Sequence, residues 1–212
     1  MSVTAPFPKL KRGLVAILRG LTPGEAVAVA QAIHAAGIEA IEVPLNSPEP
    51  FASIAGIVEA LPETALVGAG TVLTAADVDR LNDAGGKLLV SPNIDADVMS
   101  RAAHHAMVTM PGVFTPTEAF RALGLGASAL KFFPASVLGP GGIAAMRAVL
   151  PKETLVGAVG GVSEKDFAGY KSSGVTLFGL GSSLFKPGMA AAEVGARALA
   201  AADAWDAVFA KG

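Results

Sequence analysis

The chain has 212 residues, of which 52% are hydrophobic and 16% are charged, and these values predict one domain with a large core. Its formal charge of −2 gives no broad positive surface for a phosphate backbone, so nucleic acid is excluded as an expected partner, whereas small anions need only local donors. The chain has no cysteine, which excludes disulfides and thiolate zinc sites and fits a reducing compartment.

The two ends of the chain give no sign of membrane targeting. Residues 1–8 lack the basic start and apolar core of a signal peptide, and their small residues and prolines predict a loose lead-in. Residues 189–210 are the most apolar long stretch, but four charged side chains interrupt them, which predicts an amphipathic helix and not a membrane span. We therefore expect a soluble, cytoplasmic protein.

Short apolar runs recur along the chain, and each is expected to form a buried strand. The runs are residues 14–18, 38–43, 65–68, 87–91, 106–110, 128–132, 154–159 and 176–180. Runs this continuously apolar are typical of parallel strands covered on both faces, because a sheet with one wet face would alternate apolar and polar residues.

Alanine-rich segments with helix-start signals lie between these runs. In residues 22–25 and 115–118, a threonine, a proline and a glutamate have the spacing of a capping box, which predicts helix starts at both places. The helices are expected to end at glycines that can adopt a left-handed conformation. These glycines are Gly37, Gly85, Gly126 and Gly174.

Strand and helix thus alternate about eight times at roughly 25 residues per unit, the pattern of a parallel α/β fold, and the count predicts a single-domain (β/α)8 TIM barrel. A doubly wound open sheet is the alternative, because alternation alone does not show that the sheet closes. The glycines of residues 68–70 resemble a dinucleotide loop but lack its third glycine.

In such a barrel the strand ends build the active site, and polar residues stand there: Arg19, Glu42, Thr71 and Lys131. Lys131 is the sharpest signal, because desolvation in an apolar strand lowers the pKa of a lysine and a neutral amine can attack a ketone to form a Schiff base. Alternatively, its stem packs on apolar surface while its ammonium group reaches water.

The other three residues also have two interpretations each. Glu42 could carry protons for such an imine, or form a strand-end salt bridge. Arg19 could bind a carboxylate or phosphate, or pair with Glu42. Thr71 could bind the acid end of a substrate, or serve a turn or cap.

Two glycine-containing loops follow the seventh and eighth predicted strands, Gly160-Gly161 and the loop with Gly181-Ser182. Barrels frequently bind phosphate with the loops after these two strands, because missing side chains let backbone N–H groups reach the anion. Glycines needed only for tight turns are the alternative. The histidines, His34, His104 and His105, are poorly spaced for a metal, so no metal site is predicted.

Residues 41–48, 68–72, 129–134 and 159–162, in this order and spacing, resemble the aldolases of 2-keto-3-deoxy-6-phosphogluconate and 2-keto-3-deoxy-6-phosphogalactonate. The resemblance spans nearly the whole chain. It implies a homotrimeric barrel without metal or organic cofactor that cleaves a phosphorylated keto-deoxy sugar acid into pyruvate and glyceraldehyde 3-phosphate.

Carried over by position, the resemblance makes Lys131 the Schiff-base lysine and Glu42 the general acid/base. Arg19 and Thr71 would contact the reacting end of the substrate. The residues that would hold the phosphate are Gly160, Gly161, Gly181 and Ser182.

Two departures distinguish the siblings. The gluconate enzymes usually show a threonine before the glycine pair and an arginine soon after the catalytic glutamate, whereas Val159 and Asn46 occupy these places here, as in the galactonate enzyme. Loss of a hydroxyl donor beside C4 could select one epimer, which adds Val159 to the predicted substrate contacts. Activity on the gluconate epimer, a non-catalytic sugar-phosphate-binding barrel and another phosphosugar enzyme such as an epimerase remain alternatives.

Overall fold

The computed structural model describes residues 4–210, and within them nine strands form one sheet in which every neighbouring pair is parallel. The order of the strands is β5-β4-β3-β2-β1-β9-β8-β7-β6. Their bounds are β1 (Leu14–Ile17), β2 (Ala40–Pro44), β3 (Leu66–Gly70), β4 (Leu88–Val90), β5 (Val108–Met110), β6 (Gly112–Val113), β7 (Leu130–Phe132), β8 (Val156–Val159) and β9 (Leu177–Leu180).

The fifth predicted strand, residues 106–110, corresponds to β5, which pairs with β4. The two-residue strand β6, which was not predicted, follows Pro111 and pairs with β7, so the segment from β5 to β6 joins the two ends of the sheet into a barrel. Proline has no N–H to donate, which interrupts the ladder. The Pro111 carbonyl still accepts from the N–H of Lys131 at 3.0 Å, and the carbonyl of Thr109 accepts from Ala129 at 3.1 Å. The predicted barrel is therefore confirmed and the open sheet is wrong.

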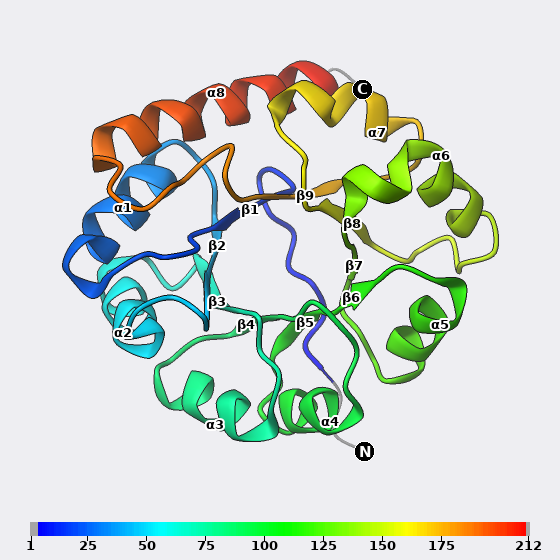
Figure 1. Ribbon diagram of the computed structural model, residues 1–212, viewed down its shortest axis with the longest axis horizontal. Coiled ribbons are helices and arrows are strands. Elements are labelled where there is room, and N and C mark those ends of the chain that lie inside the picture. The colour runs from blue at the N-terminus through cyan, green and yellow to red at the C-terminus, as the bar shows by residue number, and fades with distance from the viewer. Residues whose placement is uncertain (1–3, 211–212) are drawn as a thin grey trace.

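A ring of helices surrounds the strands (Figure 1). Their bounds are α1 (Pro23–Ala35), α2 (Pro50–Ala60), α3 (Ala75–Asp83), α4 (Ala96–His104), α5 (Pro116–Gly124), α6 (Ala135–Arg147), α7 (Phe167–Lys171) and α8 (Ala191–Phe209), with a short 3-10 turn, η1 (Glu164–Asp166). The capping boxes predicted before α1 and α5 are present. All four predicted helix-ending glycines have φ between 73° and 85°, as expected for left-handed caps.

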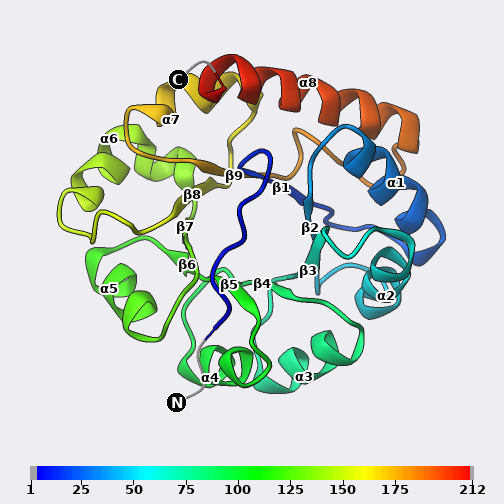
Figure 2. The ribbon, with the colours of Figure 1, turned by 180° about the vertical axis from the view of Figure 1, so that it is seen from behind.

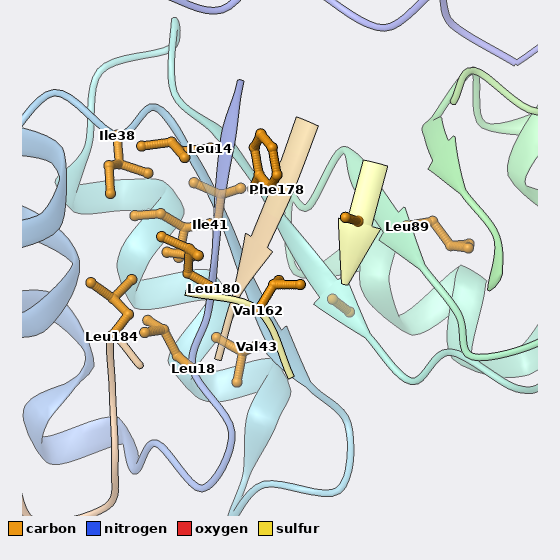
Figure 3. Packing of buried hydrophobic residues seen from close by; sticks show 14 of the residues in the cluster. Leu14, Leu18, Ile38, Ile41, Val43, Leu89, Val162, Phe178, Leu180 and Leu184 are labelled. Atoms are coloured by element: carbon orange, nitrogen blue, oxygen red, sulfur yellow. The ribbon is translucent and has the colours of Figure 1, made fainter. Parts of the chain in front are cut away.

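In six of the nine strands, the apolar residues contribute to two separate cores. In β1, Leu14 and Ala16 belong to the larger core between the strands and the helices, whereas Val15 and Ile17 belong to the smaller core inside the barrel. Figure 3 shows part of the larger core, in which Phe178 and Leu180 of β9 lie among leucines and isoleucines from the neighbouring elements. Both faces of the sheet are covered, which explains the continuously apolar runs.

The chain before β1 lies across one end of the barrel, as Figure 2 shows from behind. Ala5 pairs with Val108 and its N–H donates to Met107, while the Ser128 hydroxyl donates to the Ala5 carbonyl at 2.6 Å. Phe7 packs against the core inside the barrel. Residues 1–3 lie outside the described residues, but from residue 4 on the predicted loose lead-in is corrected to a segment bonded to the barrel.

The predicted C-terminal amphipathic helix is α8. It buries Val194, Ala198, Ala201 and Ala202, and its Asp206 forms an ion pair with Arg12 at 2.6 Å. Of the helices in residues 4–210, none is long and apolar enough to cross a membrane.

Candidate active site

A cavity of about 450 Å³ opens where the strands end. Parallel strands of a barrel bring all their carboxyl ends to the same rim, so residues far apart in the sequence meet there. Every residue predicted from the sequence lines this cavity: Arg19, Glu42, Thr71, Lys131, Val159, Gly160, Gly161, Gly181 and Ser182.

Lys131 lies in the middle of β7 and is only 6% exposed. Its neighbours Leu130 and Phe132 belong to the larger core between the strands and the helices. Since side chains alternate along a strand, Lys131 points to the inside of the barrel. Its Nζ lies 4.7 Å from the centre of the Phe133 ring. Desolvation lowers the pKa of Lys131, Glu42 opposes this effect, and Arg19 adds to it. This burial agrees with the interpretation of Lys131 as a desolvated amine.

Glu42 lies on the opposite wall. Three strands, β1, β9 and β8, lie between its strand β2 and β7 in the sheet. The Glu42 side chain is 2% exposed, and its Oε2 atom has no hydrogen-bond partner in the described part of the chain. Burial raises the pKa of Glu42 to about 7, although the positive charges of Lys131 and Arg19 act in the opposite direction.

These opposite shifts have a chemical consequence. Each group is moved toward its neutral form, which gives the amine of Lys131 a free electron pair and lets Glu42 both accept and donate a proton near neutral pH. Ionisable groups whose pKa values are strongly shifted by burial and by a charged neighbour are concentrated at functional sites. The cavity therefore combines a candidate nucleophile with a candidate proton carrier.

Arg19 does not pair with Glu42. Its Nη1 donates to Oδ1 of Asn46 at 2.7 Å, and no ion pair within residues 4–210 joins the two charged groups. Thr71 has a φ of 57°, a left-handed conformation that β-branched residues rarely adopt. Such strain costs about 1–3 kcal/mol and is concentrated at functional sites. The rim beside Glu42 thus presents a guanidinium group and a strained hydroxyl residue.

The two glycine loops lie on the other side of the cavity, after β8 and β9. Gly160 and Gly161 have φ values of 90° and 71°, so side chains would be strained at both positions. A Cβ at Gly160 would also lie 3.0 Å from the ring of Phe133. The carbonyl of Gly181 accepts from the N–H groups of Leu184 and Phe185, both at 2.9 Å, which forms a turn like the first turn of a helix, whose leading N–H groups have no backbone partner.

Sequence reasoning missed several cavity residues. They are Ile17, Pro92, Phe133, Val162, Gly179, Phe185, Lys186 and Pro187. Phe133 could have been found, because it follows Lys131 by two positions and so shares its face of the strand. Lys186 gives no comparable signal, since it lies in a loop without periodicity.

The sequence matches the family model "KDPG and KHG aldolase" over residues 9–193. The chain belongs to the KDPG and KHG aldolase family. It is 59% identical over 204 residues to the probable 2-dehydro-3-deoxy-6-phosphogalactonate aldolase of Rhizobium meliloti (strain 1021), an alignment that covers 96% of each chain. The 2-dehydro-3-deoxy-6-phosphogalactonate aldolase of Escherichia coli (strain K12) is 49% identical over 178 residues, 84% of this chain and 87% of that one.

A solved structure described as native KDPGal superimposes with a TM-score of 0.92 at 45% identity, covering 95% of this chain and 98% of the other. The aldolase family and the barrel predicted from the sequence are both confirmed. The cavity is thus the candidate active site of a KDPG and KHG family aldolase.

Proposed function

We propose that this aldolase cleaves 2-dehydro-3-deoxy-6-phosphogalactonate into pyruvate and glyceraldehyde 3-phosphate through a Schiff base on Lys131. The observation that carries the proposal is the pair formed by a buried lysine of lowered pKa and a buried glutamate whose pKa is raised to about 7, on opposite walls of one cavity. The names of the 59% and 49% identical relatives support the galactonate substrate.

The proposed reaction begins when the neutral amine of Lys131 adds to the C2 ketone and forms a carbinolamine. Glu42 protonates the leaving hydroxyl, so that water departs and an iminium ion remains. The Glu42 carboxylate then takes the proton of the C4 hydroxyl. The C3–C4 bond breaks, and the electron pair of this bond moves toward the iminium nitrogen as an enamine forms. Glyceraldehyde 3-phosphate leaves, C3 of the enamine is protonated, and water releases pyruvate from Lys131.

The cavity has groups that could bind both charged ends of the substrate, the carboxylate and the phosphate. Arg19 and Thr71 lie near Glu42, where the substrate carboxylate would bind, and arginine forms paired hydrogen bonds with a carboxylate. The glycine loops after β8 and β9 would hold the phosphate through backbone N–H groups. Because Lys131 provides the electron sink in this scheme, the proposed steps require no metal or organic cofactor.

We assign the preference for the galactonate epimer to Val159. This buried residue ends β8 at the cavity and offers no hydrogen-bond donor where the gluconate enzymes are expected to have threonine. A site without that donor loses one means of favouring the other C4 configuration. Equal catalytic efficiency on the two epimers would contradict the assignment.

The test is pyruvate release from each purified epimer, measured on the wild type and on Lys131→Ala. We expect turnover by the wild type alone, faster on the galactonate epimer. Binding of the sugar acid without turnover would support a non-catalytic barrel instead. Conversion that survives the loss of Lys131 would support another phosphosugar enzyme.

We further propose that the protein is a homotrimer in the cytoplasm. Two side chains of the α6 region, Val137 and Val149, are 71% and 59% exposed, as expected where subunits meet. The absence of cysteine fits a reducing compartment. Sedimentation equilibrium tests the trimer, and a monomer at micromolar concentration would rule it out.

A further inference from the structure

Gly70, the last residue of β3, lies next to the carboxyl group of Glu42. A Cβ built at this glycine would lie 2.0 Å from Oε2, 2.4 Å from Cδ and 2.5 Å from Oε1 of Glu42. Atoms of folded proteins do not approach a Cβ this closely. The Glu42 carboxyl group therefore occupies the space that any other residue at position 70 would fill.

The backbone does not explain this glycine. Gly70 is not among the residues of positive φ, so its conformation is open to every amino acid. It is a strand residue, and glycine inside a strand weakens the strand. The reason for a glycine at position 70 thus lies in the contact with Glu42.

Gly68, two residues earlier on the same face, provides a contrast. A Cβ at Gly68 would lie 1.8 Å from the carbonyl oxygen and 2.7 Å from the Cα of Leu88, which are backbone atoms of the neighbouring strand β4. A side chain there would force two strands apart. At Gly70 the three nearest atoms all belong to the end of one flexible side chain, so a methyl group displaces the carboxyl group and leaves the barrel intact.

We propose that Gly70 is a positioning residue for the aldol cleavage, because the absence of a side chain at position 70 leaves the space that the Glu42 carboxyl group occupies at the cavity wall. The inference rests on the proposed function, since it concerns the proton carrier of that reaction. Two further observations agree with it. Oε2 of Glu42 has no hydrogen-bond partner among residues 4–210, so packing and not a polar partner holds this oxygen, and the side chain is only 2% exposed.

The size of the expected effect follows from the distances. A Cβ at position 70 would lie 2.0 Å from Oε2 of Glu42, and an ordinary separation is at least about 3 Å, so Oε2 must move by about 1 Å. A displacement of this size between a catalytic group and its substrate can lower the rate about 100-fold. The substrate carboxylate and phosphate do not bind to Glu42 in the proposed scheme, so KM changes much less than kcat.

The experiment compares Gly70→Ala with the wild type in pyruvate release from 2-dehydro-3-deoxy-6-phosphogalactonate. We expect kcat to fall about 100-fold and KM to stay within about threefold. The limb of the pH profile that reports the ionisation of Glu42 should also move to lower pH, because the displaced carboxyl group enters the open cavity and loses the desolvation that raises its pKa. The matched control is Gly56→Ala in the outer helix α2, where the added Cβ would lie at an ordinary 3.6 Å from Val27.

The double variant Glu42→Ala/Gly70→Ala shows whether Gly70 acts on the reaction through Glu42 or is needed for the fold of the barrel. In the Glu42→Ala background the carboxyl group is absent, so Gly70→Ala should cause no further loss of kcat, and any melting temperature lost in the single variant should return. If Gly70→Ala does not fold, recovery of folding in the double variant supports the proposal. A double variant that stays unfolded, or that loses activity additively, overturns it.

Failure of this inference differs from failure of the proposed function. If the wild type does not release pyruvate, the proposed aldolase reaction is wrong whatever Gly70 does. If the wild type cleaves the substrate and Gly70→Ala retains its kcat and pH profile, only the role of Gly70 is overturned.

Discussion

Replacement of Glu42 by glutamine removes an ionisable group from the barrel interior with almost no change in shape. The carboxyl group has a pKa of about 7 in the folded protein and an ordinary value of 4.5. The folded state therefore holds its proton more tightly than the unfolded state does. Ionisation of Glu42 disfavours folding, an effect that is absent below pH 4.5 and complete above pH 7.

The magnitude follows from the difference between the two values. A shift from 4.5 to about 7 corresponds to about 3 kcal/mol at 1.36 kcal/mol per pKa unit. Glu42→Gln cannot ionise and escapes this cost. The stability of the variant relative to the wild type should thus rise by up to about 3 kcal/mol between pH 4.5 and pH 7.5.

Urea unfolding at a series of pH values and a fixed protomer concentration measures this difference. The exposed Glu63→Gln serves as the control and should change little, because its carboxylate lies at the surface. A constant difference between Glu42→Gln and the wild type across this pH range would show that Glu42 ionises normally. Glu42 would then not be a buried proton carrier.

Three further predictions concern the same molecule. Glu42→Gln should lower kcat by about 10²–10⁴-fold, the usual contribution of a general acid or base, and retention of kcat in steady-state assays would remove Glu42 from the mechanism. Val159→Thr should shift the ratio of kcat/KM toward the gluconate epimer by about 3- to 10-fold, the worth of one hydrogen bond, and an unchanged ratio would locate epimer choice elsewhere. Ser128→Ala should destabilise the protein by about 1–2 kcal/mol, because its hydroxyl bonds Ala5 at 2.6 Å and the N–H of Thr109 at 2.9 Å. Urea unfolding measures this last loss, and a loss no larger than that of the surface variant Ser172→Ala would contradict it.

The fold could be predicted because its strands are buried on both faces. Each predicted apolar run overlaps a strand, and the helix starts follow from local capping. The strand β6 after Pro111 was not predicted, because it has only two residues and its pairing with β7 leaves no local pattern. The N-terminal lead-in was misjudged for a similar reason: its hydrogen bonds go to residues more than 100 positions away, which leave no local pattern.

The candidate site likewise contains some residues that the sequence could reveal and others that it could not. Lys131 and Glu42 stand out in the sequence as charged residues in apolar strands, and both prove to be buried. Gly70 belongs to a recognisable motif, but its contact with Glu42 depends on the register of β2 and β3. Lys186 reaches the cavity through the path of a loop, which no periodicity describes.

The proposed Schiff base on Lys131 is tested most directly by incubating the protein with pyruvate and borohydride and mapping the modified peptide. Borohydride reduces an imine to a permanent adduct on its lysine. The cavity provides an internal comparison, because Lys131 is buried there whereas Lys186 is exposed. We predict one adduct per chain, on Lys131. An adduct on Lys186 or on scattered surface lysines, or no adduct at all, would contradict the proposed mechanism.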